Sequence, residues 1–284
     1  AYDAVIWNDQ NDDGVVQRAE CEIVKAEKAG TAKKRGKMGI PMGSGWGERL
    51  GKDFTLYVNG IYKYEPVRFG KDGAPIYSMK SLKKVADFSG QRGDLIPVED
   101  EDRMLFLSWS KGGNSQPYLY GVDSKNGSVQ WRYPNRYPGV HGSHRATMPK
   151  NGMLIGPLKI AGVAKVDDKV GNVFIMRGNL GQDFFMTTDG LYVGAMFEDG
   201  RMPNEVLPET EDKLNGVPME MYSHGGEPFN GWFGSQADGK IRTTVGFPRQ
   251  ASMILEVTGL DTIKRFKGPS LSLDGPAMAK ADKS

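Results

Sequence analysis

The hydrophobic residues of the chain fall mainly into short runs rich in β-branched and aromatic side chains, which is typical of β-strands. Helical spacing of hydrophobic residues is scarce and is found only over residues 19–29 and 79–87. The 38 glycines and 16 prolines among 284 residues indicate frequent turns between these runs. The pattern therefore predicts an all-β protein built from many short strands.

Four segments repeat one order of elements: a strand, an Asp-Gly or Asn-Gly pair, and another strand. Such pairs favour tight β-hairpin turns. The pairs are Asp72-Gly73, Asn126-Gly127, Asp189-Gly190 and Asp238-Gly239. Their spacing is close to that of propeller blades of ~40–50 residues. We therefore expect about four blade-like units over residues 54–267, after an N-terminal region (1–53) and before a flexible C-terminal tail (268–284). A β-sandwich is the alternative architecture.

Residues 9–20 carry the complete pattern of a twelve-position calcium loop. Asp9, Asn11 and Asp13 occupy the first three liganding positions, and Glu20 occupies the last, where it can bind through both oxygens. Ca²⁺ prefers oxygen ligands, and this spacing supplies them. The expected ligands are Asp9, Asn11, Asp13, the backbone carbonyl of Val15, Gln17 through a water molecule, and Glu20. An ordinary acidic turn is the alternative, but such a turn has no need for the glutamate.

The segments on either side of this loop predict a strand–loop–helix site. Ala4-Val5-Ile6-Trp7 is β-branched and aromatic and predicts a strand, while residues 19–29 predict a short exit helix. A calcium sensor opens a groove between two helices. Because the entering helix is missing, we expect the ion to stabilise the fold.

Residues 119–131, Leu-Tyr-Gly-Val-Asp-Ser-Lys-Asn-Gly-Ser-Val-Gln-Trp, resemble the repeat of quinoprotein-type (PQQ-like) β-propellers. In that repeat a strand ends in an Asp-containing turn, a glycine begins the next strand, and a tryptophan packs between blades. With its calcium loop, the chain also resembles secreted bacterial β-propeller proteins that carry such a loop as an insertion. The resemblance implies a secreted or periplasmic propeller segment. Four units are fewer than a closed ring of that family contains, so another chain or further blades are expected to complete the propeller.

The resemblance implies the propeller fold without the PQQ cofactor. Quinoprotein enzymes typically present a vicinal cysteine pair to the quinone, whereas Cys21 is the only cysteine of this chain. The calcium loop of residues 9–20 is also a different kind of site from the calcium site of the quinone. A redox quinoprotein is therefore the least favoured function.

The three histidines lie in glycine-rich segments between the units, where propellers usually form their pockets. His141, His144 and His224, together with Arg145 and Tyr222, are the candidate catalytic residues. A neutral histidine could abstract a proton next to a sugar carboxylate that the arginine neutralises, as in a polysaccharide lyase. The same histidines could bind a transition metal. The favoured alternative is structural, with the imidazoles bonded to loop backbone at the junctions between blades.

Composition sets limits on the partners. The formal charge of +2, from 37 basic and 35 acidic side chains, produces no strong long-range field, so neither nucleic acid nor a membrane surface is indicated. No apolar run approaches the ~20 residues of a membrane span. The chain begins at Ala1 without an initiator methionine or signal peptide, which agrees with a processed secreted protein or with a fragment of a longer one.

The aromatic residues add a possible class of ligand. We expect Trp131 to lie in the core and Trp232 to lie at the surface or in a pocket, where an amphipathic ring suits the face of a sugar. The expected function is a calcium-stabilised secreted module for binding or assembly, with glycan as a candidate ligand. The alternative is a carbohydrate-active enzyme, a polysaccharide lyase or hydrolase, with a histidine-lined pocket.

Overall fold

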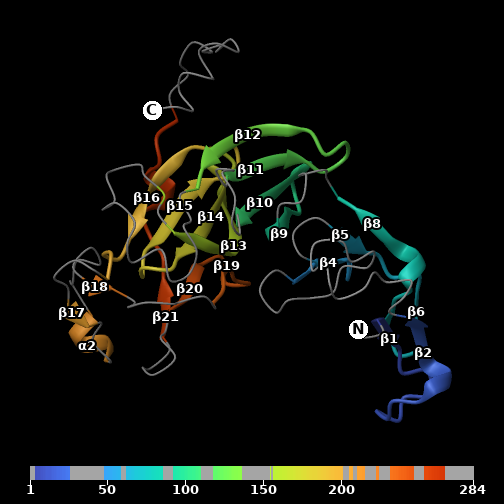
Figure 1. Ribbon diagram of the computed structural model, residues 1–284. Helices are drawn as coiled ribbons and strands as arrows, with labels where there is room; N and C mark the ends of the chain where they lie inside the picture. The colour runs from blue at the N-terminus through green and yellow to red at the C-terminus, as the bar shows by residue number, and fades with distance from the viewer. Residues whose placement is uncertain are drawn as a thin grey trace.

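The computed structural model describes residues 4–25, 48–58, 62–85, 92–109, 118–135, 154, 156–200, 205–206, 210–214, 222–223, 231–245 and 253–265. In this part of the chain almost all regular structure is β, which confirms the all-β prediction (Figure 1). Among the same residues, no helix has the length and apolar character needed to cross a membrane.

Four antiparallel sheets form the body of the described structure. The first sheet contains β3 (Arg49–Leu50), β4 (Leu56–Val58), β5 (Tyr62–Tyr64) and β8 (Leu82–Lys84). The second contains β9 (Arg92–Val98), β10 (Arg103–Trp109), β11 (Tyr118–Asp123) and β12 (Val129–Pro134). The third contains β13 (Pro157–Asp167), β14 (Gly171–Gly178), β15 (Asp183–Thr187) and β16 (Tyr192–Met196). The fourth contains β19 (Phe233–Ser235), β20 (Ile241–Val245) and β21 (Met253–Glu256).

The remaining elements are short. Three two-stranded sheets pair β1 (Ala4–Trp7) with β2 (Cys21–Val24), β6 (Arg68–Phe69) with β7 (Pro75–Ile76), and β17 (Glu205–Val206) with β18 (Tyr222–Ser223). The described helices are α2 (Glu211–Leu214) and the 3-10 turns η1 (Arg18–Glu20), η2 (Met79–Ser81) and η5 (Leu260–Thr262).

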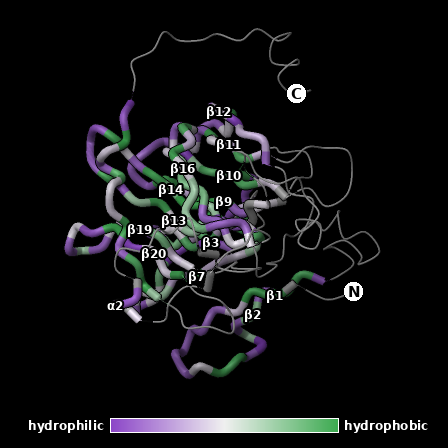
Figure 2. The backbone as a smooth tube through the Cα atoms, turned by 90° about the vertical axis from the view of Figure 1, so that its left-hand side faces the viewer, coloured by the Kyte–Doolittle hydropathy of each residue, from purple (hydrophilic) through white to green (hydrophobic). Residues whose placement is uncertain are grey.

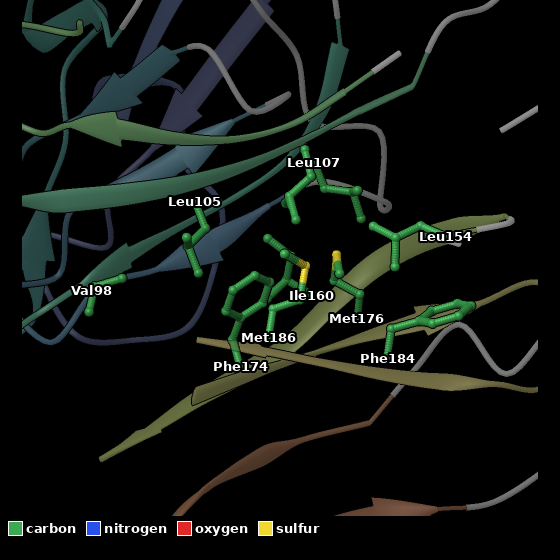
Figure 3. Close-up of a cluster of buried hydrophobic side chains, with 10 residues drawn as sticks. Val98, Leu105, Leu107, Leu154, Ile160, Phe174, Met176, Phe184 and Met186 are labelled. Carbon is green, nitrogen blue, oxygen red and sulfur yellow. The ribbon is translucent and has the colours of Figure 1, made fainter. Parts of the chain in front are cut away.

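The largest hydrophobic cluster lies between the second and third sheets. Successive side chains of a strand point to opposite faces, so Leu105 and Leu107 of β10 share one face. There they pack with Phe174 and Met176 of β14, and all four are fully buried (Figure 3). The hydrophobic segments in Figure 2 accordingly lie mainly in the strands of these two sheets.

The opposite faces of these two sheets are buried as well. Phe106 of β10 packs with Tyr57 of the first sheet. Val173 and Ile175 of β14 pack with Phe233 of the fourth sheet. The four sheets are therefore stacked face to face in chain order, and the second and third sheets each contribute side chains to two hydrophobic clusters.

The first strands of the four sheets meet. Arg49 of β3 donates two hydrogen bonds to the carboxylate of Asp94 in β9, at 3.1 and 2.7 Å. The Asp94 carboxylate also accepts the backbone N–H of Ile160 in β13 at 2.8 Å. Gly162 of β13 lies so close to β19 that a Cβ atom there would come within 2.0 Å of the Phe233 carbonyl oxygen. In Figure 1 the last strands, β12, β16 and β21, lie away from this meeting point.

The four predicted turns are confirmed. Each turn glycine adopts the left-handed conformation that its hairpin requires. The φ angles are +84° for Gly73, +73° for Gly127, +97° for Gly190 and +79° for Gly239.

Trp131 packs between sheets, as the resemblance to the propeller repeat implies, but it is partly buried where a core position was expected. Its indole N–H donates to the carbonyl oxygen of Thr188 at 3.0 Å, which joins the second sheet to the end of β15 in the third. The ring is partly buried against the main cluster and lies beside Gly190, where a Cβ atom would come within 2.9 Å of it.

The exit helix predicted for residues 19–29 is wrong over the described residues 19–25, and the helical spacing of residues 79–87 forms no α-helix over the described residues 79–85. Cys21–Val24, within the expected exit helix of residues 19–29, forms β2 and pairs with β1 in the register Trp7 to Cys21. The site is therefore strand–loop–strand, because pairing with β1 overrides the weak helical pattern. Residues 79–87 likewise begin with the single 3-10 turn η2 and continue as strand β8, which pairs with β5.

Candidate functional site

The first candidate site is the turn of the β1–β2 hairpin, where side chains hydrogen-bond to the backbone. Asp9 accepts the N–H groups of Asp12 and Gly14, each at 2.8 Å. Asp12 and Gly14 both adopt positive φ angles, +61° and +68°, which allows the chain to reverse. Asp13 accepts the N–H of Val15 at 2.7 Å. The short polar side chains thus accept the backbone N–H groups of this turn.

The other predicted ligands take part in the same network. Asp13 Oδ2 accepts the side-chain amides of Asn11, at 2.9 Å, and of Gln17, at 2.5 Å. The hydrogen bond from Val15 is the main reason that the pKa of Asp13 is lowered, and those from Asn11 and Gln17 contribute. Asp13 is thus favoured in its charged form, which is the form that binds a cation.

Glu20 ties the turn to the base of the hairpin. Its side chain is only 6% exposed. One carboxylate oxygen accepts the N–H of Gln10 at 2.9 Å, and the other accepts the indole N–H of Trp7 at 3.0 Å. Each oxygen has a second lone pair that these bonds leave unused.

The donor chemistry of this turn fits calcium, but its side chains are arranged around hydrogen bonds. Within the described residues, no three side chains of histidine, cysteine, aspartate or glutamate are grouped closely enough to hold a metal ion. The amide NH₂ groups of Asn11 and Gln17 point at Asp13 Oδ2. These amides would have to turn to present their oxygens to an ion, so the calcium site stays a prediction.

The predicted catalytic residues cannot be placed together. His141, His144, Arg145 and His224 lie outside the described residues. Tyr222 belongs to β18, for which the structure describes the backbone. The histidine-lined pocket therefore stays a prediction.

The second candidate site is a groove of about 510 Å³ where the four first strands meet. We call it the inner groove. It is lined from β3, β9, β13 and β19 and the residues that follow or precede them. The side chains that give it chemical character are Lys52, Glu99, Asp100, Lys165, Trp232 and Ser235.

Three glycines also line the inner groove: Gly51, Gly162 and Gly234. The six-membered ring of Trp232 covers Gly234, because a Cβ atom on this glycine would lie 2.6 Å from the ring. Trp232 nevertheless remains 41% exposed, in agreement with its predicted place at the surface or in a pocket.

The backbone of Trp232 is held firmly. Its N–H donates to Thr244 Oγ1 at 2.7 Å, and its carbonyl oxygen accepts the N–H of Thr244 at 2.9 Å and the hydroxyl of Thr243 at 3.1 Å. Arg177 of β14 donates in turn to Thr243 Oγ1 at 2.9 Å and to the Thr244 carbonyl oxygen. The exposed ring is therefore carried by a rigid backbone.

Arg177 also faces a buried carboxylate. Its Nε atom lies 3.7 Å from Oδ1 of Asp183, and both side chains are almost completely buried. Among the described residues, neither oxygen of Asp183 has a hydrogen-bond partner. Burial raises the pKa of Asp183 to about 6, although the charge of Arg177 opposes the shift.

Charged side chains of the groove form pairs. Lys52 makes an ion pair with Glu99, and Lys165 makes one with Asp168 at 2.8 Å. Asp100 accepts the side-chain amide of Asn172 at 2.7 Å. Apart from Trp232, the sequence reasoning missed these residues, because most of them lie in or just after first strands that the hydrophobic pattern did not reveal.

Comparisons with known proteins assign no family. No protein-family model matches the chain, and no curated protein matches it. Among solved structures the chain is similar to BamB from Moraxella catarrhalis, with 11% sequence identity and a TM-score of 0.28. The match covers 78% of this chain and 53% of the other, so the chain spans about half the length of that structure. A similarity at this level assigns neither a function nor a partner.

Asp183 predicts a specific dependence of stability on pH. Its pKa is about 6 in the folded protein, against 3.8 for an ordinary aspartate, so the folded state holds the proton more tightly. The penalty for ionising Asp183 is absent at low pH, grows as the pH rises through this window, and is complete above it. Asp183→Asn should therefore unfold with a free energy about 3 kcal/mol higher than the parent near pH 7, and the difference should shrink toward pH 4.

Urea unfolding of parent and variant across this pH range measures the difference. Asp238 supplies a control of opposite sign, because hydrogen bonds from Arg242 are the largest cause that lowers its pKa to about 2. Asp238→Asn should lose stability relative to the parent as the pH rises from about 2 to about 4, and this difference should then stay constant up to pH 7. An Asp183→Asn difference that stays constant with pH would contradict the assignment.

Proposed function

We propose that the chain is a calcium-stabilised, propeller-like module for binding and assembly, which acts outside the cytoplasm. The supporting observation is the stack of four sheets, in which the first strands of three meet through Arg49, Asp94 and Ile160 and the fourth is joined by the close approach of Gly162 to Phe233. Sheets that radiate from a common centre and bury both faces are the arrangement of propeller blades. Such an arrangement brings residues that are distant in sequence to one central groove.

The two end sheets of this stack support an assembly role. On the face of the first sheet that points away from the second sheet, Tyr64 is buried, and Leu50, which lies opposite Leu56, is the exposed hydrophobic residue. At the other end, Ile254 lies opposite Thr244 on the face of the fourth sheet that points away from Phe233. Leu50 is 60% exposed and Ile254 is 70% exposed. Another chain or further blades would cover these faces and complete the ring.

The calcium loop would stabilise the N-terminal β1–β2 hairpin. Asn8, at the start of the turn, exchanges hydrogen bonds with the backbone of Tyr77, at 3.0 and 2.9 Å. Glu22 of β2 accepts the N–H of Met79 at 3.0 Å. An ion held by Asp9, Asn11, Asp13, Val15, Gln17 and Glu20 would rigidify the hairpin that makes these contacts. Weak calcium loops of extracellular modules bind at ~0.1–1 mM, which suits a secreted or periplasmic protein.

Calcium is expected to raise the thermal stability of the chain. At a calcium concentration 100 times the dissociation constant, the free energy of unfolding should rise by about 2.7 kcal/mol. Asp9→Asn and Glu20→Gln should lose most of this increase, because each removes a charged ligand. Calorimetry of each variant, with EGTA and then with calcium, measures how much calcium raises the stability of that variant.

Asp12→Asn is the matched control for the calcium experiment. It removes one negative charge from the same turn at a position that is not expected to bind the ion, and asparagine tolerates the positive φ of this residue. This variant should keep the calcium response. A parent that melts at the same temperature with EGTA and with calcium would remove the calcium part of the proposal.

The exposed end faces predict self-association when this chain is the only protein present. Sedimentation velocity should show a population of dimers or larger species that grows with concentration. Ile254→Arg should reduce it, because a charge on the uncovered face opposes burial. Val129→Arg is the control, since Val129 is 48% exposed on β12, in a sheet inside the stack. A chain that is monomeric throughout would contradict assembly through these faces.

A further inference from the structure

The inner groove presents one aromatic ring in a fixed position. Trp232 is held through its backbone by Thr243 and Thr244, and its ring lies on Gly234, which has no side chain to displace it. Little conformational freedom would be lost when a ligand stacks on this ring, because the backbone that carries it is already ordered. A fixed aromatic surface at the wall of a cavity is a typical feature of a small-molecule site.

Most charged side chains of the groove are paired, and Asp100 adds one negative charge near Lys52 and Lys165. Arg49 is neutralised by Asp94 and Lys52 by Glu99. Lys165 is neutralised by its partner Asp168, while Asp100 is hydrogen-bonded to Asn172. The groove therefore offers no concentrated charge of either sign to attract a strongly charged ligand. It does offer ammonium donors and carboxylate acceptors close to an apolar ring.

We infer that the inner groove binds an uncharged oligosaccharide, with a sugar ring stacked on Trp232 and its hydroxyl groups bonded to Lys52, Glu99, Asp100 or Lys165. Sugars match this surface because a pyranose ring has an apolar face of C–H groups, while each hydroxyl group both donates and accepts hydrogen bonds. The groove volume of about 510 Å³ lies within the range typical of ligand sites.

This inference is independent of the proposed calcium site and of ring completion. The residues that it uses belong to β3, β9, β13 and β19 and their neighbours, while the calcium loop lies in the β1–β2 turn. A failure of calcium binding or of assembly therefore leaves it standing. Its own failure leaves both of those proposals unaffected.

The experiment is a binding titration of the full chain with defined sugars. The neutral probes are the hexaoses of cellulose, xylan, mannan and starch, and the charged probes are polygalacturonate and heparin. Isothermal titration calorimetry, with tryptophan fluorescence as a second readout, should show saturable binding of at least one neutral hexaose. Trp232→Ala should weaken this binding roughly tenfold, while Trp232→Tyr should keep most of it.

Two further variants separate ligand binding from folding. Gly234→Ala should weaken binding as well, because its Cβ atom would displace the ring of Trp232. Val129→Ala removes exposed apolar surface away from the groove and should bind like the parent. Circular dichroism and melting temperature establish that each variant is folded. Binding of charged polysaccharides alone, binding of no neutral hexaose, or neutral binding that survives Trp232→Ala would each overturn the inference.

Discussion

The buried contact among Arg49, Asp94 and Ile160 holds the centre of this structure together. Asp94 is fully buried, and burial raises its pKa, while the two hydrogen bonds from Arg49 and the one from the Ile160 N–H favour the charged form. A carboxylate in such a place would be costly without these partners. The partners come from β3, β9 and β13, so one side chain fixes the relative positions of three sheets. The same strands line the inner groove, so this contact also sets the position of the groove.

The outer parts of the sheets could be predicted from the sequence because their residues follow simple rules. β10 and β14 have continuous hydrophobic runs, and the β11–β12 and β15–β16 hairpin turns carry glycine where a positive φ is required. Trp131 was placed between sheets from its position in one repeat, and the structure confirms it. These features depend on local conformation and on burial of both faces of a sheet, and both are visible in the pattern of residues.

The centre of the structure could not be predicted in the same way. β9 has the sequence Arg-Gly-Asp-Leu-Ile-Pro-Val, in which a glycine, an aspartate and a proline interrupt the hydrophobic pattern. The glycine and the aspartate have reasons that appear only in three dimensions. Gly93 lies against the backbone of Leu107, where a Cβ atom would come within 2.0 Å of the carbonyl oxygen. Asp94 accepts a hydrogen bond from Arg49, which lies 45 residues earlier in the chain. The sequence pattern therefore failed to predict the first strands and the inner groove for one reason. Close contacts between sheets require residues, such as glycine and aspartate, that are typical of loops.

A double-mutant cycle on Arg49 and Asp94 tests this account most directly. Arg49→Met should lower the free energy of unfolding by about 3–5 kcal/mol, because it leaves the Asp94 carboxylate buried without its counter-charge. Asp94→Asn keeps an acceptor for the Ile160 N–H and removes the charge. If the first strands meet as described, the double variant should lose less free energy of unfolding than the two single variants lose together. The difference should be at least ~1 kcal/mol. Additive effects in urea unfolding would show that the two side chains do not interact, and would contradict a common centre for the sheets.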